Sequence, residues 1–346
     1  MKKSIKIFLI ILSILFIVAG VFGYYFYTKI FKSNVEINGK EEVYLYIPTN
    51  ASYQQVLDSL YSMNIIQDKI SLEWIMKKKN YNNKIRSGRY KITNHLSNND
   101  LVNLLRSGKQ SPINVTFNNI RLKEELAGKI SHQIELDSIT ILEALNDNDF
   151  LEAYGLNSQN VLIMFIPNTY EFFWNTSLKQ FFDRMHKEYN AFWNQNRLEK
   201  IERTGLTKQQ VSILASIVQA EQNFQVSEQD IIAGLYINRL KRGIPMSSCP
   251  TLIYAHKDFS IKRVYDWHKE IESPYNTYKY AGLPPGPINL PEIRAIDAVL
   301  NYDENDYIYM CAKEDFSGYH YFSKTLSQHM MYAKRYQNAA NKKGIK

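Results

Sequence analysis

The sequence has little cysteine and no apparent metal-binding pattern. Cys249 and Cys311 are its only cysteines in 346 residues, which excludes a disulfide-stapled scaffold and a thiolate metal site. The two thiols alone leave open a single disulfide or two free thiols. No His, Asp or Glu cluster has metal-ligand spacing, and no nucleic-acid motif is present. The sequence therefore predicts no metal, no cofactor and no nucleic-acid partner.

Acidic residues are in deficit, since 34 Asp and Glu face 42 Lys and Arg and leave a formal net charge of +8. That charge favours a polyanionic partner, and anionic lipid or an acidic cell-wall polymer would both fit. Hydrophobic residues make up 45% and charged residues 22%, as in globular proteins with a buried core. The length allows a small and a larger domain after an anchor.

Charge is absent from residues 7–27, which are nearly all apolar. About 20 such residues cross a bilayer core. Lys2, Lys3 and Lys6 precede the run, so the positive-inside rule keeps residues 1–6 in the cytoplasm and exports the rest. The sequence predicts a retained single-pass anchor. The alternative is a cleaved signal peptide, but no small-x-small cleavage site follows the run.

A strand–turn–helix pattern recurs after a connector at residues 28–42. Alternating residues 43–47 precede a helical stretch from Ser52, and residues 89–92 precede another from Ser97. Residues 113–117, followed by 122–130, form a third such unit. The pattern predicts an α+β fold with a small module at 43–112 and a larger mixed α+β domain at 113–346. It remains open whether the units are true repeats or the echoes that any α+β domain produces.

The larger domain is expected to be mostly helical over 131–205. Residues 164–170 are expected to form an apolar strand broken by a proline turn that lines a cleft. A helix is expected to begin at Ser227 and end at Gly243, followed by a strand at residues 252–254.

Glu221 ends the best-marked helix of the chain. Thr207 and Gln210 form a capping box at its start, and Val211, Leu214, Ala215 and Val218 form an apolar stripe that Glu221 continues. A carboxyl on such a stripe is partly desolvated, which raises its pKa, and a glycosidase acid needs a raised pKa. The spacing alone favours a solvated or arginine-paired glutamate near a helix end over a catalytic one.

The run Ala215–Glu221 resembles the catalytic helix of the endolytic murein transglycosylases, the YceG-like family. The resemblance continues in order along nearly the whole chain, through residues 167–170, 236–240, 250–251, Tyr254, 275–278, 282–288, His320, Phe322 and His329. The anchor and small module match the family's architecture, in which that module resembles a LysM domain. This chain departs from the pattern at residues 162–163, where the family has Glu-Gly, and at Gln219, Ser247 and Cys249, where it has Glu, Gln and Asp.

The resemblance implies an enzyme that cuts the β-1,4 bond between N-acetylmuramic acid and N-acetylglucosamine from outside the bacterial cytoplasmic (inner) membrane. It implies Glu221 as general acid and then base, with 1,6-anhydro ends as product, and peptidoglycan synthases as partners. Residues 275, 276, 278 and 284–287 are expected to share its groove. The full set of implied substrate-binding residues is Ser216, Glu228, Asn238, Arg239, Thr251, Tyr254, Tyr275, Asn276, Tyr278, Pro285, His320, Phe322, His329, Asn168 and Tyr170. A non-catalytic wall-binding scaffold and a hydrolytic muramidase are the alternatives.

Overall fold

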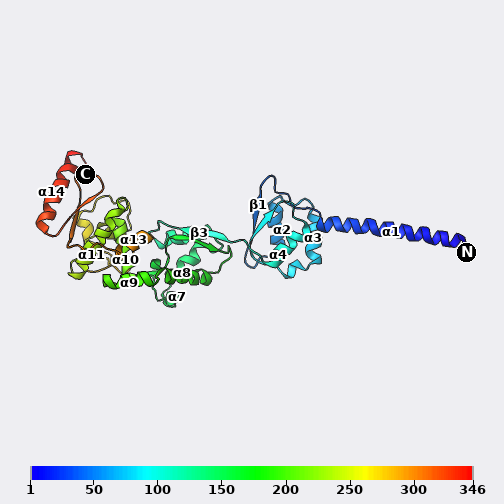
Figure 1. The fold of residues 1–346 in the computed structure, drawn as a ribbon, viewed down its shortest axis with the longest axis horizontal. Helices are drawn as coiled ribbons and strands as arrows, with labels where there is room; N and C mark the ends of the chain where they lie inside the picture. The colour runs from blue at the N-terminus through cyan, green and yellow to red at the C-terminus, as the bar shows by residue number, and fades with distance from the viewer. Residues whose placement is uncertain (1, 345–346) are drawn as a thin grey trace. The chain divides into compact units, whose positions relative to one another are not determined.

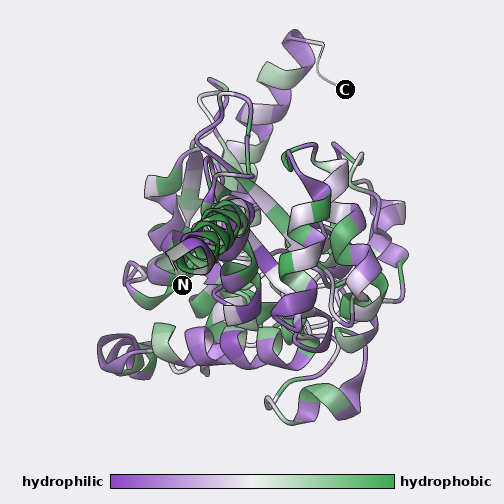
Figure 2. Cartoon of the chain, turned by 90° about the vertical axis from the view of Figure 1, so that its right-hand side faces the viewer, coloured by the Kyte–Doolittle hydropathy of each residue, from purple (hydrophilic) through white to green (hydrophobic). Residues whose placement is uncertain are grey.

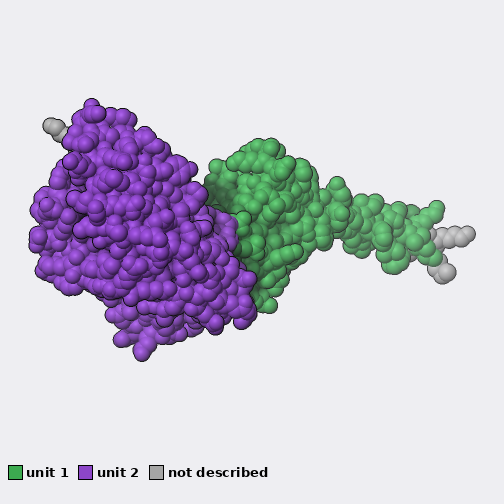
Figure 3. Space-filling model, turned by 60° about the vertical axis from the view of Figure 1, so that its left-hand side comes forward, with its two compact units in different colours: residues 1–114, 133–135, 171–176 green, residues 115–132, 136–170, 177–346 purple. Residues whose placement is uncertain are grey.

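The computed structural model describes residues 2–344 and divides into two compact units (Figures 1 and 3). The first unit holds residues 1–114, 133–135 and 171–176, and the second holds residues 115–132, 136–170 and 177–346. Both combine helices with short two-stranded sheets, so the predicted α+β class is confirmed.

The chain begins with one continuous helix, α1 (Lys2–Phe31). Apolar residues surround its axis, as the end-on view in Figure 2 shows, and residues 5–31 are long and apolar enough to cross a membrane. The predicted span at 7–27 falls inside this helix.

The rest of the first unit packs helices on a two-stranded sheet. It runs β1 (Glu42–Ile47), α2 (Tyr53–Ser62), α3 (Lys69–Lys78), β2 (Gly88–Thr93) and α4 (Asn98–Ser107). β1 and β2 pair antiparallel, with Leu45 opposite Tyr90. Ser52 and Ser97 cap α2 and α4 as predicted, each accepting a hydrogen bond from a backbone N–H in the first turn.

The segment between α1 and β1, expected only as a connector, contributes to the core of the first unit. Val35 and Ile37 are buried in the core of the first unit. Isolated bridges join Ser33 to Ser97 and Val35 to Ile66. Two apolar residues in a polar stretch carry no periodic signal, so sequence reasoning could not place them in the core.

The first half of the second unit is mainly helical, as predicted. β3 (Ile113–Phe117) pairs with β4 (Asn168–Phe172), and most residues of both strands belong to this unit. The helices are α5 (Lys123–Ser131), α6 (Ser138–Ala144), α7 (Asn148–Glu152), α8 (Leu178–Phe192) and α9 (Gln195–Thr204). The expected strand at 164–170 begins later, because residues Val161–Met164 form a buried 3-10 turn.

The second half is built around α10 (Lys208–Glu221), whose residues 211–219 are all buried. It packs against α11 (Gln229–Lys241), α12 (Cys249–His256) and α13 (Ile293–Leu300). The hairpin of β5 (Tyr309–Ala312) and β6 (His320–Ser323) packs against α14 (Leu326–Lys342). The expected capping box of Thr207 and Gln210 is present.

Two local predictions in this half were wrong. Residues 252–254 lie within α12, because a three-residue apolar run does not distinguish helix from strand. The helix expected from Ser227 begins at Gln229, after a short 3-10 turn over Val226–Glu228. Glu228 therefore occupies the N-cap position, and its side chain bonds elsewhere.

Candidate active site

Glu221 is the last residue of α10, and two hydroxyls hold its carboxylate in place. Tyr236 of α11 donates a hydrogen bond to Oε1 at 2.7 Å, and Ser248, at the start of α12, donates to the same oxygen at 2.5 Å. Both donors are buried. The carboxyl is therefore fixed in one orientation at the wall of a pocket.

Burial raises the pKa of Glu221 above its ordinary value. The hydrogen bonds from Ser248 and Tyr236 stabilise the carboxylate and lower the pKa of Glu221. The charges of His320 and Arg239 also lower it. Desolvation is the largest influence. The site thus holds a carboxyl poised to keep a proton at higher pH than an exposed glutamate.

Two threonines position Ser248. Its backbone N–H donates to Thr277 Oγ1 at 3.0 Å, and its carbonyl accepts from Thr251 Oγ1 at 2.8 Å. The two threonine hydroxyls lie 2.7 Å apart in hydrogen-bonding contact, and both residues are buried. This network joins residues far apart in sequence and fixes the donor that faces Glu221.

Arg239 shapes the floor of the pocket. Its guanidinium donates to the backbone carbonyls of Ile308 at 2.7 Å, of Pro245 at 3.0 Å and of Met246. It therefore ties the loop before α12 to the residue that precedes strand β5. The pocket has a volume of about 330 Å³, and its lining comes from four regions: Glu221; Leu235, Tyr236 and Arg239; Met246, Ser247, Cys249 and Tyr278; and residues 308–312, His320 and His329.

Both cysteines are free thiols, and both line this pocket. Cys249 Sγ lies 3.1 Å from Tyr278 Oη. Burial raises the pKa of the Cys249 thiol. At this position the pocket therefore presents a neutral thiol, where the resembling family has a carboxylate.

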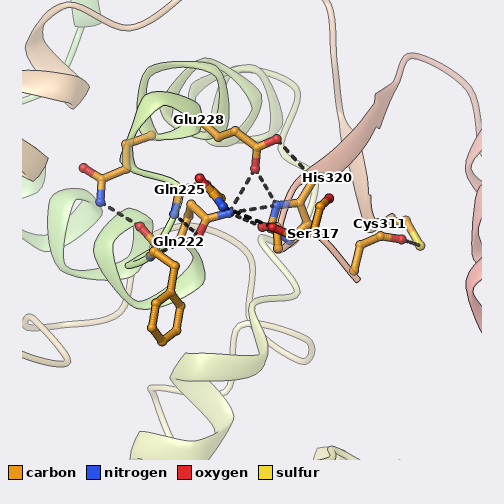
Figure 4. Close-up of polar contacts among 10 residues, drawn as sticks. Gln222, Gln225, Glu228, Cys311, Ser317 and His320 are labelled. Atoms are coloured by element: carbon orange, nitrogen blue, oxygen red, sulfur yellow. Dashed lines mark hydrogen bonds and ion pairs between the residues drawn. The ribbon is translucent and has the colours of Figure 1, made fainter. Parts of the chain in front are cut away.

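A polar network around Glu228 holds His320 (Figure 4). Glu228 is only 6% exposed, and its two oxygens accept from the backbone N–H of His320 and contact His320 Nδ1, both at 2.9 Å. Gln222, directly after Glu221, donates to Glu228 Oε2 at 3.0 Å and to the carbonyl of Gly318 at 2.8 Å. The network orients His320, which lines the pocket.

Most of the predicted substrate-binding residues fall into three groups. Those that line the pocket with Glu221 are Arg239, Tyr278, His320 and His329. Those that contact these residues or their supports are Glu228, Thr251 and Phe322, whose ring lies 6.2 Å from that of His320. Those whose polar groups bond to the protein's own backbone are Ser216, Asn238 and Asn276.

The remaining predicted residues lie outside the pocket lining. Tyr254 and Tyr275 pack ring against ring, with centroids 4.8 Å apart. Pro285 borders a separate hollow with Tyr280 and Glu272. In β4, the ring of Tyr170 stacks on that of Phe117.

Asn168 also lies in β4, where its side chain is exposed and accepts from the N–H of Thr169 at 2.8 Å. Gly286, next to Pro285, is required by close packing, since a Cβ there would lie 1.9 Å from the carbonyl oxygen of Gln159.

Sequence reasoning missed the two donors to Glu221. Tyr236 opens the run Tyr236–Leu240, and Ser248 lies in the loop singled out only for its departures from the family pattern. The available signal was that Tyr236 belongs to a run that carries the resemblance, and that Ser248 lies between two positions, Ser247 and Cys249, where the chain departs from the family pattern. Neither shows a local periodicity pointing to Glu221, which precedes them by 15 and 27 residues.

With this geometry established, comparison with known proteins decides the family. The model of the YceG-like family matches residues 45–335. The chain belongs to the YceG-like family. The match includes α10, the Ser248 loop and the β5–β6 hairpin, so every residue described around Glu221 lies within it.

Two named relatives and one solved structure match most of the chain. An endolytic murein transglycosylase of Bacillus subtilis is 26% identical over 340 residues, which cover 93% of this chain and 92% of that protein. An endolytic murein transglycosylase of Streptococcus pneumoniae is 24% identical over 351 residues, which cover 90% of this chain and 62% of that protein. A solved YceG-like protein of Listeria monocytogenes superposes with a TM-score of 0.55 at 24% identity, covering 85% of this chain and 99% of that structure.

Proposed function

We propose that this YceG-like protein is an endolytic peptidoglycan transglycosylase that cleaves the glycan between N-acetylmuramic acid and N-acetylglucosamine. The observation that carries the proposal is a single desolvated carboxyl, Glu221, fixed by Tyr236 and Ser248 at a pocket wall. Among the pocket-lining side chains of the described chain, Glu221 is the only carboxyl. The relatives named as murein transglycosylases support the substrate class.

One carboxyl suffices when the nucleophile belongs to the substrate. Protonated Glu221 donates its proton to the bridging oxygen as the bond from that oxygen to the muramyl C1 breaks. The muramyl 6-hydroxyl oxygen then bonds to C1, and the Glu221 carboxylate takes up the hydroxyl proton. Glu221 ends as it began, and no water is consumed. Ordinary glycosidases instead use two carboxyls, with water as the final nucleophile.

Product mass tests this reaction. Purified protein should release muropeptides with 1,6-anhydro ends from peptidoglycan, one water lighter than reducing-end products and resistant to borohydride reduction. Reducing ends would identify a hydrolytic muramidase and contradict the transfer step. No release would point to a wall-binding scaffold. Cys249 stands where the family pattern described above has Asp. This departure keeps the non-catalytic alternative open, so product mass is the measurement that distinguishes the three functions.

The pH dependence tests the environment of Glu221. Ser248→Ala removes a donor that stabilises the carboxylate, so the pKa of Glu221 should rise further. The first step needs the protonated acid, and activity is therefore lost as pH rises through that pKa. The alkaline limb of the pH–rate profile should move to higher pH in this variant.

A buried serine on α10, the helix that carries Glu221, provides the control. Ser212→Ala removes a hydroxyl that bonds only the carbonyl of Lys208, and its profile should match that of the unaltered protein. An alkaline limb that stays in place in Ser248→Ala, or moves to lower pH, would show that Ser248 does not control the protonation of Glu221.

The same proposal assigns α1 as a retained anchor in the bacterial cytoplasmic (inner) membrane, with the residues from Lys29 onward on its outer side. The apolar length of α1 and the preceding lysines support it. We also propose that residues 43–112 act as a LysM-like module that binds glycan, and that peptidoglycan synthases are partners, since a cut within new strands ends their elongation.

A further inference from the structure

Helix α3 carries an apolar face made of an exposed isoleucine and a half-buried tryptophan. Ile70 is 84% exposed, and Trp74 follows one turn later on the same face. The opposite face packs Leu72, Ile75 and Met76 into the core. One exposed isoleucine needs no explanation by itself; the meaning of this face depends on where it lies relative to α1 and on the charges around it.

The end of α1 fixes α3 in position. The ring of Phe26 stacks on that of Trp74, with centroids 5.5 Å apart and planes 28° apart. One turn further on, Lys29 forms an ion pair with Asp68, the N-cap residue of α3. Asn98 donates to the carbonyl of Lys29 at 2.9 Å. All these contacts lie within the first unit, so the height of α3 along the α1 axis is set.

That height coincides with the edge of a bilayer core. The uncharged run 7–27 has 21 residues, and at about 1.5 Å per residue it spans roughly 31 Å, the thickness of the hydrocarbon core. Phe26 is the penultimate residue of this run. The Trp74 ring stacked on it therefore lies where hydrocarbon meets headgroups, the depth that tryptophan prefers.

The charges around this face fit an anionic surface. Lys69, Lys77 and Lys78 flank it and are exposed, and the Lys78 Nζ lies 5.9 Å from the centre of the Trp74 ring. The only acid on α3, Glu73, accepts from the hydroxyl of Tyr61 at 2.9 Å. Lysines around apolar side chains are typical of helices that lie in the interface of anionic membranes.

We propose that the Ile70–Trp74 face of α3 is a second membrane contact, which seats the first unit on the anionic outer leaflet of the bilayer that α1 crosses. The inference rests on the proposed anchoring by α1. An interfacial helix beside a spanning helix limits rotation of the first unit about the α1 axis.

Lipid quenching of tryptophan fluorescence tests this contact. The full chain is reconstituted into phosphatidylglycerol–phosphatidylcholine vesicles carrying a lipid spin-labelled near the headgroup. We expect this quencher to lower the emission. In Trp74→Phe, which retains a ring against Phe26, most of that loss should disappear. Trp267→Phe is the matched control, because Trp267 is 67% exposed but belongs to the second unit, and its removal should leave the lipid-dependent loss in place.

The side chains around Trp74 give a second readout. Ile70→Glu and the double change Lys77→Glu with Lys78→Glu alter exposed positions, so the fold should survive. Each should shift Trp74 from quenching by the lipid label towards quenching by aqueous iodide.

The outcomes separate this inference from the proposals it rests on. Protein that floats with the vesicles while Trp74 is quenched only by iodide would overturn the contact and leave the anchor intact. A Trp74 shielded from both quenchers would overturn it in favour of a contact with another copy of the chain. Failure to float would overturn the anchor and this inference together. Muropeptide release, assayed on the same samples, reports separately on the proposed chemistry.

Discussion

Glu221→Gln should abolish glycan cleavage while the protein remains folded. The amide keeps the shape and helix propensity of the side chain, and its oxygen can still accept from Tyr236 and Ser248. It carries no transferable proton. General acid–base assistance is worth roughly 10²–10⁴-fold, and one residue serves both steps here, so we expect a loss of about 10⁴-fold or more in muropeptide release.

A thermal measurement separates lost chemistry from lost structure. Because the folded state raises the pKa of Glu221, the folded protein binds this proton more tightly than the unfolded chain. The associated stability is present below the unfolded carboxyl pKa of about 4.3 and is lost as pH rises through the folded value. At neutral pH, Glu221→Gln should therefore melt at the same or a higher temperature than the unaltered protein, and the difference should shrink towards about pH 4.

The surface change Glu199→Gln on α9 is the control, since this exposed carboxylate bonds only Gln195 on its own helix. It should alter neither cleavage nor the melting profile. If Glu221→Gln released anhydro-muropeptides at a rate near that of the unaltered protein, the catalytic assignment would be wrong.

Glu228→Gln should weaken cleavage without abolishing it. The carboxylate accepts from the His320 backbone and from Gln222 and contacts His320 Nδ1. In one orientation the new amide nitrogen faces the donor of Gln222, and in the other it faces the His320 N–H. Either way a buried donor meets a donor, at a cost of about 1–3 kcal/mol in the free energy of unfolding. Misplacing His320 at the pocket should slow cleavage by about 10–100-fold.

A double-mutant cycle tests whether Glu228 acts through His320. In a His320→Gln background the imidazole is gone, so Glu228→Gln should reduce cleavage little further. In Glu228→Gln alone, activity should still fall as pH rises through the pKa of Glu221. Losses that simply multiply in the double variant would indicate that Glu228 acts independently of His320.

Local sequence signals placed α10 well and the loops after it poorly. The capping box at Thr207 and Gln210 and the apolar stripe predicted the helix that ends at Glu221. Residues 252–254 were assigned as a strand because three apolar residues carry no period. Ser227 was assigned as a cap because a serine three residues before an acid matches the capping pattern. In the folded chain Glu228 takes the N-cap position, and its side chain bonds His320, 92 residues away.

The sequence by itself determined the long apolar helix α1, the strand–helix units and the placement of Glu221 on a core-facing stripe, because these depend on neighbours within a few turns. Only the tertiary structure decided which groups surround that carboxyl. Tyr236, Ser248 and His320 approach it from three different elements, and hydrogen-bond partners across such separations leave no periodic trace in the chain. The pKa of Glu221 depends on this enclosure, so its suitability as an acid is a property of the fold.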